Sequence, residues 1–389
     1  MSQNGVTSAI PAAPNKQIPL SKPLVGEEEL ANIAATLASG YLGSGPAVDR
    51  FEELVKALLG AKHFVATASC TAALHMSLEA LDLPPGSGVL VPSLTFASSV
   101  QAVLMARLRP VFCEVGEDLL IDVDDARERI SSDVRAVMPV HYGGRICDVS
   151  VLQKHADLQV VDDAAHAFGS RHGSRPLGSR GLAVCFSFDP VKAITCGEGG
   201  GISTDDATFS ERLRVLRSVG IARPRKGSSG AGHSVVSFGY RYHMNDIAAS
   251  IGLAQLDRFG LVCRRRQEIC RSYVARLEPL SGIRIPSADY SEIVPYNFAI
   301  LVLNGKRAAL QRWLSDRGIV TGVHYAPNHL QPAFNKFYTP LPMTERIGAE
   351  ILSLPLYSAM TDDELEIVID AISAFFTTCD DRTREYDHC

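Results

Sequence analysis

Lys192 and Asp163 are the residues of this sequence whose types and spacing point most directly to a chemistry. Lys192 lies in the run SFDPVKAITCGEGG at 187–200, and Asp163 closes the apolar run VVDD at 160–163. A lysine amine can form a Schiff base with the aldehyde of pyridoxal 5'-phosphate (PLP), and a buried carboxylate can partner the pyridinium nitrogen of that cofactor. The pair therefore supplies both ends of a PLP site. To carry a proton as well, Lys192 needs a lowered pKa.

A phosphate cup is predicted where a strand gives way to a helix in ATASCTAALHM, residues 66–76. Small polar residues at such a junction leave free N–H groups and the positive end of the helix facing an anion. Cys70 and Thr71 begin this helix, and Ser187, which follows another strand, adds a hydroxyl. We therefore expect the phosphate of the cofactor at this helix start.

Short apolar runs that alternate with helical patterns must position these residues. Runs that are apolar on both faces are typical of a mainly parallel sheet, whose ligands bind at the carboxyl ends of its strands. Asp163, Ser187 and Lys192 all follow such a run. Strands are predicted at 63–67, 88–92, 110–115, 136–140, 158–162, 183–188, 200–204 and 297–303. Helices are predicted at 25–37, 246–277, 306–317 and 362–376.

Length and composition set the remaining bounds. The 389 residues, 46% of them hydrophobic, suffice for one large core and a smaller second domain. A net charge of −5 argues against a nucleic-acid partner. No run approaches the ~18–20 apolar residues of a membrane span, and no secretory signal is visible, so we expect a cytoplasmic protein. The nine cysteines form no CxxC pair, which disfavours a disulfide framework and a zinc site.

Over residues 18–378 the motifs resemble the DegT/DnrJ/EryC1/StrS family of PLP-dependent sugar aminotransferases. The resemblance implies an α/β fold, PLP-dependent transferase fold type I, whose large domain has a mainly parallel central sheet flanked by helices, beside a smaller C-terminal α+β domain. The divisions expected are a mobile lead at 1–17, a large PLP-binding domain at 18–260 and a small domain at 261–389.

The same resemblance assigns further residues to the cofactor. It places Asp163, rather than the neighbouring Asp162, at the ring nitrogen, and it stacks Phe96 on the face of PLP. His166 would contact the hydroxyl side of the ring. The alternative for His166 is a histidine that only packs in the interior, and the alternative for Phe96 is an ordinary core phenylalanine. Cys70 replaces a glycine of the family, which preserves the backbone contacts unless that glycine needs a positive φ.

A homodimer with composite active sites is also implied. In the family an asparagine reaches across the dimer interface to the neighbour's phosphate, and Arg241 stands at that place, where a cation can serve through a charge-assisted bond. His243 replaces a family arginine, which puts the usual contacts to a substrate diphosphate in doubt. The residues expected near the substrate are Gly45, His243, His324, Tyr325 and His329.

The leading interpretation is an aminotransferase that passes an amino group, by family habit from glutamate, to a nucleotide-linked keto sugar in a ping-pong scheme. A relative acting on a keto cyclitol or another carbocyclic substrate is the alternative. Dehydratases of the family carry histidine where this chain has Lys192, which argues against that reaction. A PLP-binding homologue kept for regulation, or a cysteine nucleophile at Cys70 or Cys196, has no supporting motif.

Overall fold

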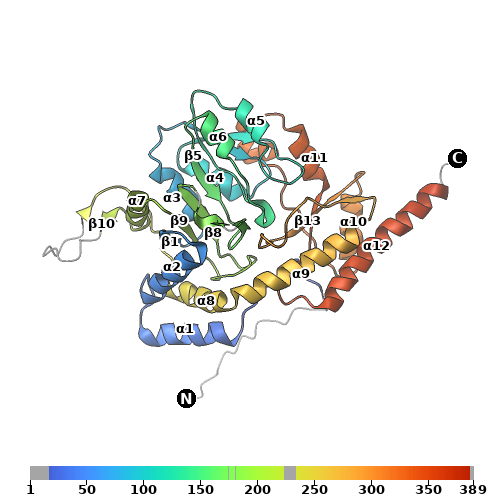
Figure 1. The fold of residues 1–389 in the computed structure, drawn as a ribbon, viewed down its shortest axis with the longest axis horizontal. Coiled ribbons are helices and arrows are strands. Elements are labelled where there is room, and N and C mark those ends of the chain that lie inside the picture. Colours follow the sequence, from blue (N-terminus) through green and yellow to red (C-terminus); the bar gives the residue numbers. More distant parts are fainter. Residues whose placement is uncertain (1–16, 174, 180, 223–233, 386–389) are drawn as a thin grey trace, which may run out of the picture.

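Figure 1 shows the computed structural model, which describes residues 17–173, 175–179, 181–222 and 234–385. The chain forms a large lobe around a central sheet and a small lobe, and the long helix α9 (Phe259–Leu277) runs from one lobe to the other. Apart from Gln17, the lead predicted at 1–17 lies outside the described residues. Among the described helices, none is long and apolar enough to cross a membrane.

The central sheet of the large lobe has seven strands in the order β1-β9-β8-β5-β4-β2-β3. Four of its pairings are parallel, and β9 runs antiparallel to both β8 and β1, which confirms the mainly parallel sheet. The strands are β1 (His63–Thr67), β2 (Gly88–Pro92), β3 (Arg109–Cys113), β4 (Val134–Val137), β5 (Gln159–Asp163), β8 (Ala183–Ser187) and β9 (Gly200–Thr204).

Helices cover both faces of this sheet because successive strand residues point to opposite faces. Val65 and Cys185 pack in one apolar core with α3, whereas Phe64 and Val184 pack in another with α2. The large-lobe helices are α1 (Glu27–Ser39), α2 (Pro46–Leu59), α3 (Cys70–Ala80), α4 (Ala97–Met105), α5 (Val123–Glu128), α6 (Ser150–His155), α7 (Ala207–Arg217) and α8 (Asp246–Asp257).

The single helix predicted at 246–277 is wrong in one respect, because the chain forms two helices, α8 and α9. Between them Arg258 leaves the helical backbone region, with φ −108° and ψ 9°. Its guanidinium pairs with Glu28 and Glu29 of α1, so the turn is fixed by charged contacts that the helical pattern of 246–277 does not reveal.

The small lobe is a three-stranded antiparallel sheet packed against helices. Its strands are β12 (Ile283–Arg284), β13 (Phe298–Val302) and β14 (Ile351–Leu354), and its helices after α9 are α10 (Arg307–Ser315), α11 (Pro342–Glu350) and α12 (Asp362–Glu385). In Figure 1, α12 runs past α10 toward the C-terminus. Two short antiparallel pairs complete the described strands: β6 (Arg171–His172) with β7 (Arg175–Pro176), and β10 (Ile221–Ala222) with β11 (Ser234–Val235).

The domain division near residue 260 stays a prediction, and two features bear on it. The buried part of α9 from Ile269 onward belongs to the small-lobe core, whereas Phe259 packs in a large-lobe core. Near the N-terminus, Ile18 forms a parallel bridge with Ile319 and packs in the small-lobe core. The first residues described therefore lie with the small lobe.

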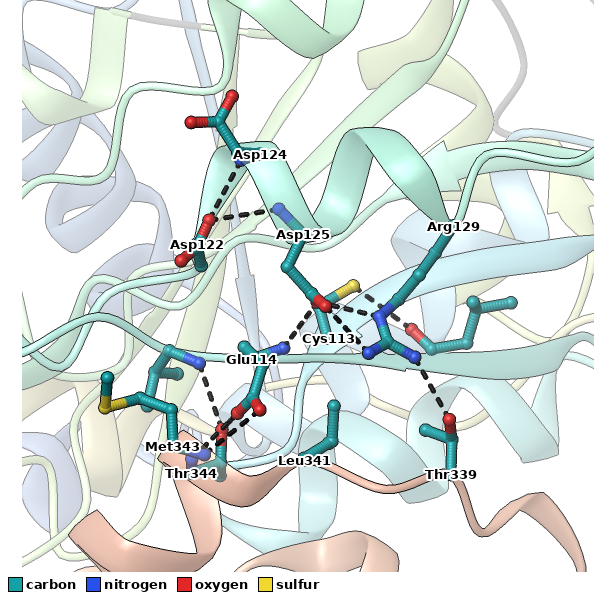
Figure 2. Close-up of polar contacts among 12 residues, drawn as sticks. Cys113, Glu114, Asp122, Asp124, Asp125, Arg129, Thr339, Leu341, Met343 and Thr344 are labelled. Atoms are coloured by element: carbon teal, nitrogen blue, oxygen red, sulfur yellow. Dashed lines mark hydrogen bonds and ion pairs between the residues drawn. The ribbon is translucent and has the colours of Figure 1, made fainter.

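Buried polar contacts fasten the two lobes together (Figure 2). The carboxylate of Glu114, just after β3, accepts hydrogen bonds from the backbone N–H groups of Met343 (3.1 Å) and Thr344 (2.7 Å) at the start of α11. Nearby, Arg129 forms a two-point ion pair with Asp125 while it also donates to the Thr339 hydroxyl at 3.1 Å. The lobes are thus joined close to the carboxyl ends of the sheet strands.

Candidate active site

A cavity of about 230 Å³ opens at the carboxyl ends of β5 and β8, between the large lobe and the small one. Its walls come from the first turns of α3 and α4, the strand ends, the loop after β8, and small-lobe segments around 296 and 324. The predicted site residues that line it together are Cys70, Thr71, Phe96, Asp163, His166, Ser187, Lys192, His324 and Tyr325.

Asp163 is buried at the end of β5, and its carboxylate is held from two sides. Its Oδ2 accepts a hydrogen bond from the Ser99 hydroxyl at 2.6 Å, and its Oδ1 accepts one from the Ala165 N–H at 3.1 Å. Burial raises the pKa of Asp163 above its usual value, against these two bonds and the charge of Lys192. The competing Asp162 faces elsewhere, with its Oδ1 3.0 Å from the His141 Nε2. The arrangement favours Asp163 as the carboxylate of this cavity.

Lys192 lies in the loop that follows β8, with its side chain extending toward the small lobe. Its Nζ lies 4.0 Å from the centroid of the Tyr296 ring. Burial lowers the pKa of Lys192, and the charges of Cys70, Asp189 and Asp163 oppose that shift. A lysine with a lowered pKa is neutral more often, which is what an attacking amine or a general base requires.

The start of α3 faces the cavity with Cys70 and Thr71. Ser69 caps this helix, because its hydroxyl accepts from the Ala72 N–H at 3.2 Å. Cys70 has the ordinary negative φ of a helix start, so replacing the family glycine creates no backbone strain. Gly200 on β9 is needed beneath this turn, since a Cβ there would lie 2.4 Å from the Cys70 nitrogen. Free N–H groups of a first helical turn suit an anion.

Aromatic rings form the other walls of the cavity. Phe96, at the N-cap of α4, leaves 57% of its surface exposed, and its ring centroid lies 5.7 Å from that of Tyr325. A core role for Phe96 does not match that exposure. On the far side His166 stacks on Tyr296 with centroids 4.0 Å apart and an interplanar angle of 17°.

The two histidines of the cavity are neutral at neutral pH. Burial and the charges of Lys192 and His324 lower the pKa of His166 well below its usual value. Its Nδ1 accepts from the Gly143 N–H at 3.5 Å, which assigns the ring proton to Nε2, 3.0 Å from the Tyr325 hydroxyl. Burial lowers the pKa of His324 to about 4, and its Nδ1 lies 2.9 Å from the Ser353 hydroxyl.

Four of the predicted residues lie outside this cavity. Arg241 and His243 line a separate hollow of about 430 Å³ with Gly43, Ser44, Met244 and Asn245. Gly45 is the N-cap residue of α2, and its N–H donates to the buried Asp246 carboxylate at 2.8 Å. His329 is fully buried, with its Nδ1 2.7 Å from the Ser93 hydroxyl and its Nε2 3.2 Å from Glu345. Within one chain, these contacts account for Gly45 and His329 structurally, and their substrate roles stay predictions.

Other residues at the cavity carry no assignment from the sequence. Asp189 and Glu198 flank Lys192, and Ser99, which contacts Asp163 from behind the cavity wall, lies three positions after Phe96, so proximity in the chain and helical spacing could have indicated them. Tyr296 precedes a predicted strand of the small lobe, and no local pattern marks it as a partner of Lys192. Further cavity residues of this kind are Ser69, Thr95 and Ser98.

The residues present fit PLP. A buried carboxylate at a strand end suits the ring nitrogen, the small side chain of Ala165 and the ring of Phe96 suit the two ring faces, and an amine with a lowered pKa suits the aldehyde. The first turn of α3 and the hydroxyl of Ser187 suit the phosphate.

Comparisons with known proteins agree with this chemistry. The model of the DegT/DnrJ/EryC1/StrS aminotransferase family matches residues 23–373. The chain is 36% identical to the spore coat polysaccharide biosynthesis protein SpsC of Bacillus subtilis, over 92% of this chain and 97% of SpsC.

Solved structures share the fold. The sugar aminotransferase CalS13 of Micromonospora echinospora is 30% identical with a TM-score of 0.85, covering 92% of this chain and 99% of its own. Spr1654 of Streptococcus pneumoniae, known in a PLP form, is 26% identical with a TM-score of 0.86, covering 93% and 98%. The predicted fold class is therefore confirmed.

Proposed function

Because the chain belongs to the DegT/DnrJ/EryC1/StrS aminotransferase family and is a PLP-dependent aminotransferase, we propose that its amino acceptor is a nucleotide-linked keto sugar. The amino donor in this proposal is an amino acid, glutamate in the first place, and the two substrates react in turn by a ping-pong mechanism. The observation that carries the amino-transfer chemistry of this proposal is the meeting of Lys192 and Asp163 in one cavity.

Each wall of the cavity has a part in this reaction. When bound, PLP supplies a ring that withdraws electrons from the carbon bearing the amino group. The Asp163 carboxylate would hold a proton on the ring nitrogen, and the first turn of α3 with Ser187 would bind the phosphate. Lys192, whose pKa burial lowers, would take the proton from the α-carbon of the donor in the first half-reaction. In the second half-reaction it would deliver a proton to the carbon of the acceptor that receives the amino group.

A sugar acceptor is supported by relatives and by the lining of the cavity. CalS13 is a sugar aminotransferase, and SpsC takes part in making a polysaccharide. Hydroxyl and imidazole groups also line the cavity, and such groups can pair with the hydroxyls of a sugar. The residues that bring them are Thr95, Ser98, His324 and Tyr325.

A homodimer belongs to the same proposal. Lys192 is the one lysine or arginine among the described residues that line the cavity, whereas a phosphate and a donor carboxylate both call for cations. Arg241 is exposed outside the cavity, next to apolar side chains that are also exposed: Val235 at 72%, Val236 at 60% and Phe238 at 99%. A second copy packed on this apolar surface would bring Arg241 to its neighbour's cofactor.

Free thiols support a reducing, cytoplasmic location. The seven cysteines whose side chains the structure describes are all free, and six of them are buried. Proteins of oxidising compartments more often pair their cysteines.

A half-reaction assay tests the function. Purified enzyme incubated with glutamate alone should convert its PLP to the amine form and release one equivalent of 2-oxoglutarate per site, since each half of a ping-pong exchange proceeds without the other substrate. The amine form should then aminate members of a panel of nucleotide-linked keto sugars. Lys192→Ala, which removes the amine but leaves the cavity walls, should lose both the visible absorbance of lysine-bound PLP and turnover.

Two results would contradict the proposal. Retention of absorbance and turnover in Lys192→Ala would remove Lys192 from the chemistry. Amination of keto cyclitols, with no reaction of any keto sugar in the panel, would replace the nucleotide-linked acceptor with a carbocyclic one.

A further inference from the structure

Tyr296 makes the contact with Lys192 that neither the motifs nor the proposed reaction explains. It comes from the small lobe, two residues before β13, whereas Lys192 comes from the large lobe. The Nζ of Lys192 lies 4.0 Å from the centroid of the Tyr296 ring, within the range of a cation–π interaction. Tyr296 is buried, with 9% of the residue exposed, and a desolvated cation–π contact is stronger than an exposed one.

The ring of Tyr296 is held in place by two other contacts. Its face stacks on His166 with the ring centroids 4.0 Å apart, and its hydroxyl interacts with that of Tyr325. Tyr325 is in turn 3.0 Å from the His166 Nε2, and Gly143 donates to the other nitrogen of that imidazole. A ring fixed by stacking and by a chain of hydrogen bonds loses little freedom when a cation settles on it.

We propose that Tyr296 is a positioning residue for Lys192, whose ammonium rests on the Tyr296 ring whenever the amine is not bonded to the cofactor. This inference rests on the proposed role of Lys192. A buried ammonium without a partner is costly, so a free lysine in this cavity needs a place that stabilises its charge. A cation–π contact stabilises an ammonium less than a close ion pair with a carboxylate does, so the ring does not hold the amine firmly in its charged form.

Other charges around Lys192 act on it from several elements, and the ring adds to them. The carboxylates of Asp163 and Asp189 and the thiol of Cys70 favour the charged amine, while burial disfavours it. The imidazoles of His166 and His324 also face Lys192, and its charge lowers the pKa of each. Glu198 lines the same cavity. A substitution at position 296 changes none of these groups itself, but Tyr296→Leu also removes the stacking partner of His166, so the contribution of the ring is read by comparison with variants that keep it.

Amine labelling of the apoenzyme tests the proposal without any turnover. Pulses of acetic anhydride at a series of pH values, followed by mass spectrometry of the peptide containing Lys192, give the pH at which half of this amine is neutral. The exposed Lys62 serves as the internal reference. Tyr296→Leu keeps an apolar, buried neighbour but removes the ring face. Because the ring stabilises only the charged amine, this variant should lower the Lys192 midpoint by about 0.4 to 1.5 pH units.

Two variants define what the shift means. Tyr296→Phe keeps the ring face and loses only the hydroxyl, so its midpoint should stay within about 0.3 pH units of the wild-type value. Tyr290→Leu removes another buried small-lobe ring, which contacts Phe298 rather than Lys192, and should leave the midpoint unchanged. An unshifted midpoint in Tyr296→Leu would overturn the proposal, and so would a shift in Tyr296→Phe as large as in Tyr296→Leu.

If Tyr296→Leu does not fold, a second series of variants that keeps the shape of the ring tests the same proposal. Phenylalanine analogues with one, two and three fluorine atoms at position 296 weaken the negative face of the ring stepwise while nearly keeping its volume. The Lys192 midpoint should then fall with each added fluorine, and a flat series would overturn the proposal. Neither labelling experiment depends on the acceptor, so a wrong acceptor and a wrong role for Tyr296 give different results.

Discussion

At the residue scale, the Ser99 hydroxyl has the largest single part in keeping Asp163 ionised. The Asp163 carboxylate is buried, which raises its pKa, and the Ser99 hydroxyl at 2.6 Å is the strongest influence in the opposite direction. A carboxylate must be ionised to hold a proton on the nitrogen of the cofactor ring. Ser99 therefore helps to keep Asp163 charged in a place that disfavours charge, together with the Ala165 N–H and Lys192.

Ser99→Ala should narrow the pH range of activity from the acid side. Loss of a hydrogen bond to the charged form raises the Asp163 pKa further, by about one unit if the bond is worth about 1.5 kcal/mol. Since activity requires the ionised form, kcat should begin to fall at a higher pH than in the wild type as the pH is lowered. The measurement is the acid limb of the kcat–pH profile.

The matched control for Ser99 is another buried hydroxyl with a neutral partner. Ser203 donates to the Gly178 carbonyl at 2.8 Å and does not touch the cavity, so Ser203→Ala should leave the acid limb in place. An acid limb that stays fixed or moves to lower pH in Ser99→Ala would mean that Asp163 does not control the profile.

At the element scale, α11 has its N-terminal cap on the opposite lobe. Its own N-cap residue, Leu341, provides no side-chain acceptor. Glu114 accepts instead from the N–H groups of Met343 and Thr344, and a buried carboxylate at the positive end of a helix is favourable (Figure 2). The Thr344 hydroxyl accepts in return from the Val115 N–H at 3.0 Å. The start of α11 is thus part of the join between the lobes.

Glu114→Ala should destabilise the enzyme much more than Glu117→Ala. Both glutamates belong to the large lobe and bind the small lobe, but Glu114 is buried, whereas Glu117 makes exposed ion pairs with Arg284 and Arg346. Leaving the helix N–H groups unpaired should cost about 2–4 kcal/mol, and losing exposed pairs about 0–1 kcal/mol. Urea unfolding of the apoenzyme compares the two midpoints, and equal losses would contradict the capping role of Glu114.

Sequence patterns predict the elements of the large lobe better than the contacts between lobes. The strands could be predicted because apolar runs reflect burial on both faces, and Asp163, Ser187 and Lys192 follow from the rule that ligands bind at strand ends. The contacts of Tyr296 and Glu114 could not be predicted, because their partners are distant in the chain and meet them only when the two lobes pack together. Short-range periodicity carries no information about such pairs.

At the scale of the whole molecule, the site is short of positive charge in a single chain. The described lining of the cavity includes one basic side chain, Lys192, and Arg241 is exposed in a different hollow. The strongly exposed Phe238 lies close to Arg241 in the chain, so an apolar contact between two copies at Phe238 would place Arg241 at the interface. In a two-fold dimer each chain would contribute its Arg241 to the site of the other chain, so both sites would contain residues of both chains.

Mixed dimers test this arrangement directly. Lys192→Ala and Arg241→Ala homodimers should each be inactive or nearly so, because every site lacks one of the two groups. Unfolding and reassociating an equal mixture should restore about a quarter of the wild-type activity, since half of the dimers are then mixed and one of their two sites has both groups. If Arg241 served the site of its own chain, every site in the mixture would still lack one group. An inactive mixture that contains heterodimers, detected by mass spectrometry, would therefore reject the composite site.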